Sequence, residues 1–222
     1  LTAFGMGEAG LHTRALSPYL GASLSFGTAL EGGATAPGQL LAADLLDVYA
    51  VGRPRRVEAL FALLGGRVAH SLSPAIHNAR FEELGLPFLY VPVALGSLGS
   101  EIGPLREACD ELGLPLRGAS VTVPFKETAG ALAGAPGETR NTLLFGDDGS
   151  VASANTDRDA LLAAIPEAPE DGAALVLGAG GMARSAVEAL VARGWHVDLA
   201  ARTAARAATL AASCGARVVA SP

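Results

Sequence analysis

Short apolar runs alternate with helix-like periodicity along the middle of the chain. Residues 59–64, 88–93 and 118–123 are apolar runs with the length of buried strands. Residues 73–84, which open with Ser-Pro and end before a Gly, and residues 101–112 are typical of helices. Strand–helix–strand alternation of this length predicts a parallel sheet covered by helices, and therefore an α/β fold.

A second unit of the same kind follows toward the C-terminus. Its strands and helices are predicted to alternate at residues 174–177, 181–193, 197–200 and 204–213. Residues 217–222 have the composition of a strand that has just started. We therefore predict a first domain at residues 58–165, with a mixed, largely parallel sheet. Residues 166–222 are predicted to form an incomplete Rossmann-like domain.

Residues 1–50 lack this alternation and form a third part of the chain. They contain two short apolar runs, at 1–4 and 22–26, and a periodic stretch at 40–49 that predicts a helix. Residues 51–57 include the basic, turn-prone sequence Gly-Arg-Pro-Arg-Arg and are predicted to be a linker. For this basic cluster, we favour a solvated connector over an anion-binding site.

Composition excludes several classes of protein. Half of the 222 residues are hydrophobic and 17% are charged, which predicts a substantial core rather than disorder. The net charge of -6 argues against nucleic-acid binding, which needs clustered Lys and Arg. No apolar run approaches the roughly 20 residues that span a membrane. Cys109 and Cys214 have no partners at metal-ligand spacing, so neither a metal site nor a disulfide framework is predicted.

These features favour a cytoplasmic protein. The chain begins with Leu1 rather than Met and ends in an unfinished strand. We therefore expect it to be part of a longer polypeptide. The sequence predicts no oligomeric state.

A glycine-rich turn joins the strand predicted at 174–177 to the following helix. It reads Gly178-Ala179-Gly180-Gly181-Met182-Ala183, which is a dinucleotide-binding fingerprint with Ala in place of the third Gly. Such a turn lets a pyrophosphate approach the backbone and the unpaired N–H groups at the helix N-terminus. A plain glycine-rich turn is the alternative, but the strand–turn–helix context favours dinucleotide binding.

The residues after the next strand favour NADP over NAD. NAD sites usually carry an acidic residue there to bind the ribose 2′-hydroxyl, whereas this chain has Arg202, Thr203 and Arg206, with no carboxylate after Asp198. Two arginines can bind a 2′-phosphate through charge-assisted hydrogen bonds. The alternative is that both are surface charges one helical turn apart.

Two serines lie where the first strand passes into a helix. Ser71 and Ser73 either hydrogen-bond a ligand in a cleft or, in the case of Ser73, act as a helix N-cap. On these residues alone the cap interpretation is favoured. Asn141, followed by Thr142, offers an amide of the kind that binds a polyhydroxylated ring.

A lysine occupies an unfavourable place near Thr122. Lys126 is predicted in the first turn of a helix, where the macrodipole opposes a cation, and this unfavourable placement together with partial burial would suit proton transfer. A solvated lysine is the alternative. Asp157, itself a possible N-cap, would orient the ammonium if it lay nearby and so complete a proton-transfer pair.

The order and spacing of these motifs resemble shikimate dehydrogenase over about residues 60–222. The resemblance rests on Ser71-Leu72-Ser73-Pro74 with His77-Asn78, Val121-Thr122-Val123-Pro124-Phe125-Lys126, Asn141-Thr142, Asn155-Thr156-Asp157, the glycine turn and Arg202-Thr203. It implies reversible, NADPH-dependent reduction of 3-dehydroshikimate to shikimate. It implies Lys126 and Asp157 as catalytic residues and NADP as the cofactor. The implied substrate-binding residues are Ser71, Ser73, Thr122, Asn141 and Asp157.

The chain departs from that family's pattern at several positions. Ser120 stands where Asn is usual, Thr139 and Arg140 stand where Gly-Ala precedes the Asn-Thr pair, and Ala201 replaces an Asn. Ser120 has a shorter reach than Asn for a ligand, and Arg140 bears on which groups of the substrate ring are accepted. Two alternatives stay open: a quinate dehydrogenase that uses NAD, against which Arg202 and Arg206 count, and an inactive fragment, since the chain stops before the rest of the nucleotide domain.

Residues 1–50 resemble the C-terminal end of a type I dehydroquinate dehydratase, which is a TIM barrel. The resemblance rests on residues 6–14, 20–26 and 35–39 and implies substrate contacts by Arg14, Thr35 and Gln39. The Schiff-base lysine and its histidine would lie upstream of this stretch, so no dehydratase activity is expected from the chain. We expect residues 1–50 to be a barrel remnant that is either loosely held or docked non-natively. The order of the two parts resembles a bifunctional dehydratase–dehydrogenase.

Overall fold

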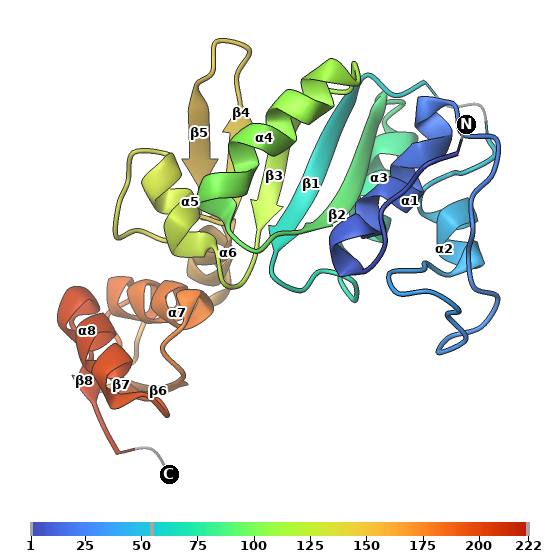
Figure 1. Ribbon diagram of the computed structural model, residues 1–222. Helices are drawn as coiled ribbons and strands as arrows, with labels where there is room; N and C mark the ends of the chain where they lie inside the picture. The colour runs from blue at the N-terminus through green and yellow to red at the C-terminus, as the bar shows by residue number, and fades with distance from the viewer. Residues whose placement is uncertain (1, 54–55, 221–222) are drawn as a thin grey trace.

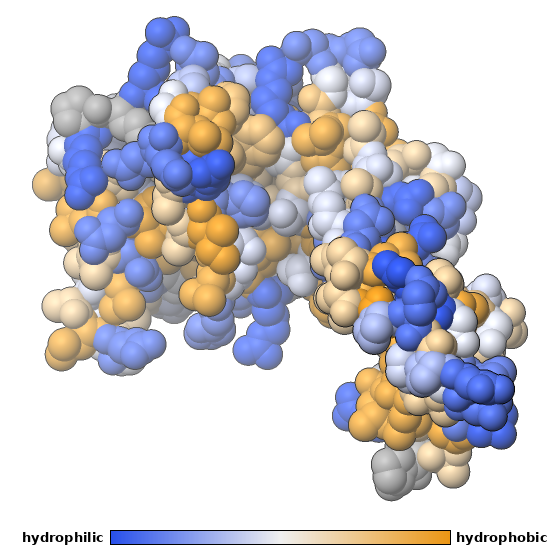
Figure 2. Space-filling model, turned by 180° about the vertical axis from the view of Figure 1, so that it is seen from behind, coloured by the Kyte–Doolittle hydropathy of each residue, from blue (hydrophilic) through white to orange (hydrophobic). Residues whose placement is uncertain are grey.

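The computed structural model describes residues 2–53 and 56–220, which form two sheets and an N-terminal segment (Figure 1). Residues 54 and 55 of the predicted linker lie outside the described residues. The larger sheet lies between the N-terminal segment and a smaller C-terminal domain. In Figure 2, seen from behind, that smaller domain projects from the body of the molecule.

The larger sheet has five strands in the order β2-β1-β3-β4-β5. The strands are β1 (Ala59–Gly65), β2 (Phe88–Ala94), β3 (Leu116–Val121), β4 (Thr142–Phe145) and β5 (Val151–Ala154). The pairs β1–β2 and β1–β3 are parallel, whereas β3–β4 and β4–β5 are antiparallel. The predicted mixed sheet is therefore confirmed. The short turn between β4 and β5 can join only antiparallel neighbours, whereas β3 and β4 are joined through α5.

Four helices accompany this sheet: α3 (Ser73–Glu83), α4 (Leu98–Glu111), α5 (Lys126–Leu132) and α6 (Thr156–Ala164). Because crossovers between parallel strands are right-handed and β2 and β3 flank β1, α3 and α4 cover opposite faces. Strands β1 and β2 are buried along nearly their whole length, since both faces are covered. This explains why their sequences are continuous apolar runs rather than alternating ones.

The N-terminal segment does not form barrel strands. It contains α1 (Leu11–Leu16), α2 (Ala42–Asp47) and short 3-10 turns at Glu8–Gly10 and Ser17–Leu20. Among described residues 2–50, its one β interaction is an isolated bridge between Thr28 and Leu41. The expected barrel remnant is therefore not confirmed. Parallel barrel strands need neighbours on both sides to satisfy their backbone groups, and this segment supplies none.

The expectation that residues 1–50 are loosely held is wrong, while the alternative of non-native docking stays a prediction. Leu11, Ala15 and Tyr49 are buried in the same core as strand β2 and helix α4, on the face opposite α3. Glu8 also accepts a hydrogen bond from the backbone N–H of Val68, at 3.1 Å. The segment is thus an integral cover of the larger sheet.

The smaller domain is a three-stranded parallel sheet in the order β6-β7-β8. Its elements are β6 (Ala173–Leu177), α7 (Gly181–Ala192), β7 (His196–Ala200), α8 (Ala204–Cys214) and β8 (Arg217–Val218). Val176 faces the core shared with α7 and α8, while Leu175 and Leu177 alternate to the other face and are 57% and 67% exposed. The predicted Rossmann-like arrangement is confirmed.

No helix of residues 2–53 and 56–220 is long and apolar enough to cross a membrane. Within the same residues, no group of three or more His, Cys, Asp or Glu side chains could hold a metal ion. Cys109 and Cys214 are both free thiols.

Candidate functional site

A cavity of about 480 Å³ lies at the carboxyl ends of β1 and β3. Because β4 runs antiparallel to β3, the start of β4 meets the same edge of the sheet. All six residues predicted to bind or convert a substrate line this cavity: Ser71, Ser73, Thr122, Lys126, Asn141 and Asp157. They come from four separate segments of the chain, and the topology of the sheet gathers them.

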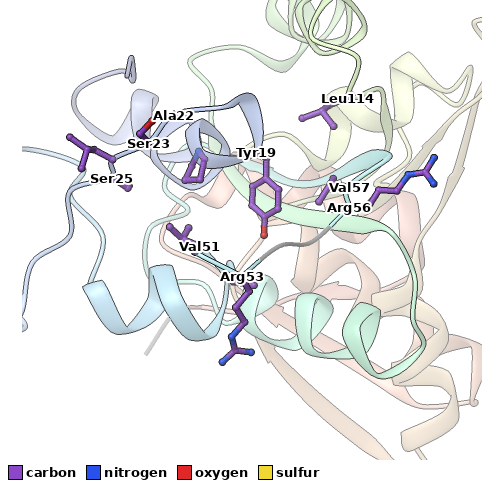
Figure 3. A pocket seen from close by; sticks show the side chains of 13 residues that line it. Tyr19, Ala22, Ser23, Ser25, Val51, Arg53, Arg56, Val57 and Leu114 are labelled. Carbon is purple, nitrogen blue, oxygen red and sulfur yellow. The ribbon is translucent and has the colours of Figure 1, made fainter. Parts of the chain in front are cut away.

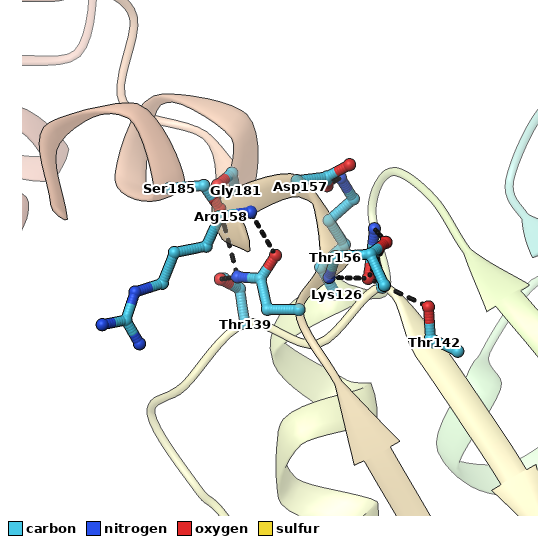
Figure 4. Close-up of polar contacts among 10 residues, drawn as sticks. Lys126, Thr139, Thr142, Thr156, Asp157, Arg158, Gly181 and Ser185 are labelled. Carbon is cyan, nitrogen blue, oxygen red and sulfur yellow. Dashed lines mark hydrogen bonds and ion pairs between the residues drawn. The ribbon is translucent and has the colours of Figure 1, made fainter. Parts of the chain in front are cut away.

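Lys126 and Asp157 form an ion pair inside this cavity (Figure 4). The Lys126 ammonium donates a hydrogen bond to Asp157 Oδ2 at 2.5 Å, and the two side chains are 13% and 22% exposed. Lys126 is the first residue of α5, where the helix dipole opposes a cation. Asp157 lies in the first turn of α6, where the dipole favours a carboxylate. The carboxylate thus offsets the unfavourable placement of the ammonium.

Lys126 is the single lysine among the 222 residues, and the other 15 basic residues are all arginines. An arginine keeps its proton at any physiological pH, whereas a lysine ammonium can release one. At this position the chain, which uses arginine for its other permanent cations, therefore carries a cation that can release a proton.

Asp157 is not the N-cap of α6, contrary to the possibility raised by the sequence. The cap is Asn155, whose Oδ1 accepts a hydrogen bond from the Arg158 N–H at 3.2 Å. The Asp157 carboxylate is therefore directed to Lys126 rather than to the backbone of its own helix. Asn and Asp have similar N-cap propensities, so propensity alone does not separate Asn155 from Asp157.

Ser73 is not a side-chain cap either. Helix α3 begins at Ser73 with Leu72 in the cap position, and no side-chain cap bond is formed. The Ser71 hydroxyl lies 3.1 Å from the Ser73 hydroxyl and accepts the Ser73 N–H at 3.2 Å. Both hydroxyls line the cavity, so the ligand interpretation is favoured over the cap.

The Asn141 amide is held by the start of α6. Its Oδ1 accepts the Thr156 N–H at 2.9 Å, and its Nδ2 donates to the Thr156 hydroxyl at 2.8 Å. An amide nitrogen carries two hydrogens, so one remains for a ligand in the cavity. The side chain is thereby fixed in direction before any ligand binds.

A second cavity, of about 440 Å³, lies at the N-terminus of α7. Of the residues predicted to bind a dinucleotide, Ala179, Gly180, Gly181 and Arg206 line it. Gly178, Arg202 and Thr203 do not. Gly178 has a φ of 120°, which only glycine adopts readily, so its role lies in the shape of the turn.

Met182 lines the first cavity rather than the second. The sequence placed it with the glycine turn because it follows Gly181 directly. Since α7 begins between the two cavities, successive residues of its first turn face different ones. The smaller domain therefore contributes a wall to the cavity of the larger one.

Lys126 lines both cavities. Its side chain packs closely against the glycine turn, because a Cβ on Gly181 would lie 3.2 Å from the Lys126 Cδ. The Lys126 ammonium thus lies where a ligand in the first cavity, the hydroxyl-rich cavity lined by Ser71, Ser73 and Thr122, would meet a dinucleotide bound at the glycine turn.

The second cavity fits a dinucleotide with a 2′-phosphate. It presents the unpaired N–H groups of the α7 N-terminus together with two cations, Arg184 and Arg206. Asp198 is engaged elsewhere: Arg217 donates to its carboxylate at 2.8 and 2.9 Å and lowers its pKa. One carboxylate, that of Glu127, lines the cavity.

Sequence reasoning missed two residues of the first cavity, Arg67 and His70. Both lie in the loop after β1, in the sequence Gly-Gly-Arg-Val-Ala-His. Among the described residues, Arg67 forms no ion pair. The rule that ligands bind beyond the carboxyl ends of parallel strands could have found both, because this loop directly follows the first predicted strand.

A larger cavity, of about 560 Å³, lies away from the Lys126–Asp157 pair, beside the N-terminal segment (Figure 3). Arg53 and Arg56 line it, but Arg53 pairs with Glu82 at 3.8 Å and Arg56 with Glu58 at 2.9 Å. These paired arginines agree with a solvated connector, and the cavity holds none of the predicted site residues.

The three residues predicted from the dehydratase resemblance are not gathered in one cavity. Arg14 is buried, with its guanidinium 4.4 Å from the Phe4 ring centre. Thr35 and Gln39 lie at the surface, where the Gln39 Oε1 accepts the Thr35 N–H at 2.8 Å. Their roles stay predictions.

Three family models match the chain. Residues 63–139 match the shikimate dehydrogenase substrate binding domain. Residues 161–221 match shikimate / quinate 5-dehydrogenase. Residues 1–53 match type I 3-dehydroquinase. These matches bear out both resemblances stated from the sequence.

Relatives of known function point to the same family as the family models. The NADP(+) shikimate dehydrogenase of Caulobacter vibrioides is 40% identical over 177 residues, which cover 72% of this chain and 60% of the relative. The chloroplastic bifunctional 3-dehydroquinate dehydratase/shikimate dehydrogenase of Arabidopsis thaliana is 30% identical over 237 residues, covering 96% of this chain and 38% of the relative. The chain spans about 60% of the length of the Caulobacter relative.

The solved structures that resemble this chain include shikimate dehydrogenases. Shikimate dehydrogenase from Aquifex aeolicus matches with a TM-score of 0.59 and 32% identity, covering 74% of this chain and 63% of that chain. The Thermus thermophilus enzyme in complex with NADP(H) and shikimate matches with a TM-score of 0.57 and 37% identity, covering 72% and 62%.

Proposed function

The chain belongs to the shikimate dehydrogenase family over residues 63–139 and 161–221, and we propose that it carries out that family's reaction. The reaction is the reversible, NADP-dependent interconversion of 3-dehydroshikimate and shikimate. One observation carries the proposal. The sole lysine, paired with Asp157 at 2.5 Å, lines both the hydroxyl-rich cavity and the cavity at the glycine turn.

The first cavity suits a small polyhydroxylated acid. Its walls offer the hydroxyls of Ser71, Ser73 and Thr122, which can both donate and accept hydrogen bonds, and one free N–H of Asn141. Arg67 adds a positive charge at its edge. We assign the serines and Arg67 to the carboxylate of the ligand, and Thr122 and Asn141 to its ring hydroxyls.

Lys126 acts as the acid and base of the reaction. Bound NADPH supplies the hydride, and Lys126 Nζ donates a proton to the oxygen of the ketone as it becomes an alcohol. In the oxidation direction, the neutral amine takes that proton back. Asp157 holds the ammonium in place and also accepts a hydrogen bond from the neighbouring ring hydroxyl. General acid–base catalysis of this kind contributes typically about 10²–10⁴-fold to a rate.

NADP is the proposed cofactor because of the charges around the second cavity. Arg184 and Arg206 line it, and the one carboxylate of β7, that of Asp198, lies in mid-strand and pairs with Arg217. A 2′-phosphate would gain charge-assisted hydrogen bonds here. The curated Caulobacter relative carries NADP(+) in its name.

We also propose that the chain is part of a bifunctional polypeptide. The support is the match of residues 1–53 to type I 3-dehydroquinase and the coverage of 96% of the chain by the bifunctional Arabidopsis protein. The burial of Leu11, Ala15 and Tyr49 in the dehydrogenase core indicates that the two parts are physically joined rather than tethered.

The experiment is a steady-state assay of the purified full-length protein. Shikimate should be oxidised with NADP⁺, and 3-dehydroshikimate reduced with NADPH, followed by the absorbance of the reduced cofactor. Quinate with NAD⁺ is the matched comparison. Turnover of quinate in preference to shikimate, or no turnover of either, would contradict the proposal.

A further inference from the structure

A buried amide joins the two domains beneath the Lys126–Asp157 pair. The side chain of Asn155 lies between β5 and α6, and the residue is 9% exposed. The sequence suggested only that this residue belongs to an Asn-Thr-Asp motif. Its hydrogen-bond partners, Thr139, Arg158 and Ser185, come from both domains and are labelled in Figure 4.

On the side of the larger domain, the amide has two partners. Its Oδ1 accepts the Arg158 N–H at 3.2 Å and so caps α6, the helix that carries Asp157. Its Nδ2 donates to the hydroxyl of Thr139 at 3.2 Å. Thr139 is 3% exposed and lies one residue before Arg140, whose N–H bonds the carbonyl of Lys126. Both catalytic side chains are therefore linked to this amide through their own backbone segments.

On the side of the smaller domain, the partner is Ser185 of α7. The Asn155 Nδ2 donates to the Ser185 hydroxyl at 3.1 Å, and that hydroxyl donates to the Gly181 carbonyl at 3.3 Å. Ser185 is 1% exposed. Gly181 is the first residue of α7 and lines the dinucleotide cavity. The chain of hydrogen bonds thus runs from the α6 cap to the glycine turn.

The hydrogen bonds of the Asn155 amide restrict the movement of the groups that they join. A buried amide with its oxygen and both its hydrogens engaged has no alternative partner, so it fixes the direction of every group that it bonds. Proton transfer depends on the placement of Lys126 and Asp157 to within a fraction of an ångström. Movement of α7 would therefore be transmitted to the cap of α6.

We propose that Asn155 is a positioning residue that couples the dinucleotide turn to the Lys126–Asp157 pair through Ser185 and Thr139. This rests on the proposed dehydrogenase function. A purely structural role is the rival: there the same hydrogen bonds would stabilise the fold and leave catalysis unchanged once the protein is folded.

The test removes the link without touching the cap. Ser185→Ala deletes one partner of the amide, and Thr139→Val deletes the other with little change of shape. Thr139→Ser restores the hydroxyl and is the rescue variant. Ser17→Ala is the matched control, because Ser17 is also a buried serine bonded to a helix carbonyl, that of Arg14 at 3.4 Å, but belongs to the N-terminal segment.

The first measurement is steady-state kinetics of the full-length protein, which gives kcat and KM for each variant. In Ser185→Ala and in Thr139→Val, kcat should fall about three- to tenfold, which is the size expected for one buried hydrogen bond, with KM for shikimate within about twofold. Thr139→Ser and Ser17→Ala should keep the parent kcat. In an Asp157→Asn background the effect of Ser185→Ala should shrink below about twofold, because the two changes act on the same pair.

Amide hydrogen exchange supplies a readout that needs no turnover. If Asn155 is held by Ser185, the Arg158 amide should exchange faster in Ser185→Ala than in the parent or in Ser17→Ala. Unchanged exchange at Arg158 overturns the proposal whether or not the protein is an active dehydrogenase. Faster exchange with an unchanged kcat in an active enzyme also overturns it, since the network would then be structural. If the unmodified parent protein shows no dehydrogenase activity, that result would instead refute the proposed function.

Discussion

The Lys126 ammonium lies 2.5 Å from Asp157 Oδ2, although 31 residues separate the two in the chain. The start of α5 and the start of α6 bring them together, so the pair exists only when β3, β4 and β5 are in register. Its position between the hydroxyl-rich cavity and the glycine turn places a proton donor where a substrate and a dinucleotide would meet.

Arg206 should determine the preference for NADP. It lines the dinucleotide cavity, whereas Arg202 does not. Arg206→Ala should lower kcat/KM for NADP⁺ about ten- to a hundredfold, which is the size of a charge-assisted contact, and change the value for NAD⁺ by less than about threefold. Arg202→Ala should have the smaller effect. Equal losses with both cofactors, or a parent that prefers NAD⁺, would refute this assignment.

Arg67 should bind the carboxylate of the substrate. The Arg67 side chain lines the same cavity as Ser71 and Ser73. Its guanidinium has no ion-pair partner among the described residues. Arg67→Gln should raise KM for shikimate roughly tenfold with kcat nearly unchanged, because the contact is made equally in the ground and transition states. The methyl ester of shikimate should show no such change.

The control for Arg67 is Arg80→Gln, which removes an exposed arginine of α3 that pairs with Glu83. It should leave KM unchanged. If Arg67→Gln weakens the ester as much as the acid, Arg67 does not recognise the carboxylate.

His12 should make the stability of the protein depend on pH. Burial lowers the pKa of His12 below its ordinary value of 6.5, and its Nδ1 has no hydrogen-bond partner among the described residues. The unfolded chain therefore binds the proton more readily. The free energy of unfolding should therefore be highest above about pH 6.5, and it should decline as the pH falls toward the lower pKa of His12 in the folded protein.

Urea unfolding at several pH values between about 5 and 7.5 measures this dependence. His12→Gln should reduce the slope of the unfolding free energy against pH in that range. His77, whose pKa burial also lowers, should account for part of the slope that remains. An unchanged slope in His12→Gln would contradict the assignment.

Much of the fold and of the site followed from local sequence patterns. The strands at β1 and β2 were predictable because both faces are covered, which leaves continuous apolar runs. The gathering of Ser71, Thr122 and Lys126 was predictable because strand ends of a parallel sheet meet at one edge.

Other features depend on tertiary contacts that no local pattern encodes. Asn155 rather than Asp157 caps α6 because the helix begins at Thr156, and the Asp157 carboxylate pairs with Lys126 instead. Met182 faces the first cavity because α7 starts between the two cavities. The burial of Leu11 against the larger sheet could not be predicted from the N-terminal sequence, whose apolar runs form no strands among residues 2–53.

The kcat of Lys126→Arg tests the central claim most directly. Arginine keeps the positive charge and can still pair with Asp157, but it does not release its proton at physiological pH. If Lys126 transfers a proton, Lys126→Arg and Lys126→Met should both lower kcat by roughly two to four orders of magnitude, with KM for shikimate changing far less. A Lys126→Arg enzyme with near-normal kcat would show that only the charge matters and would contradict the account.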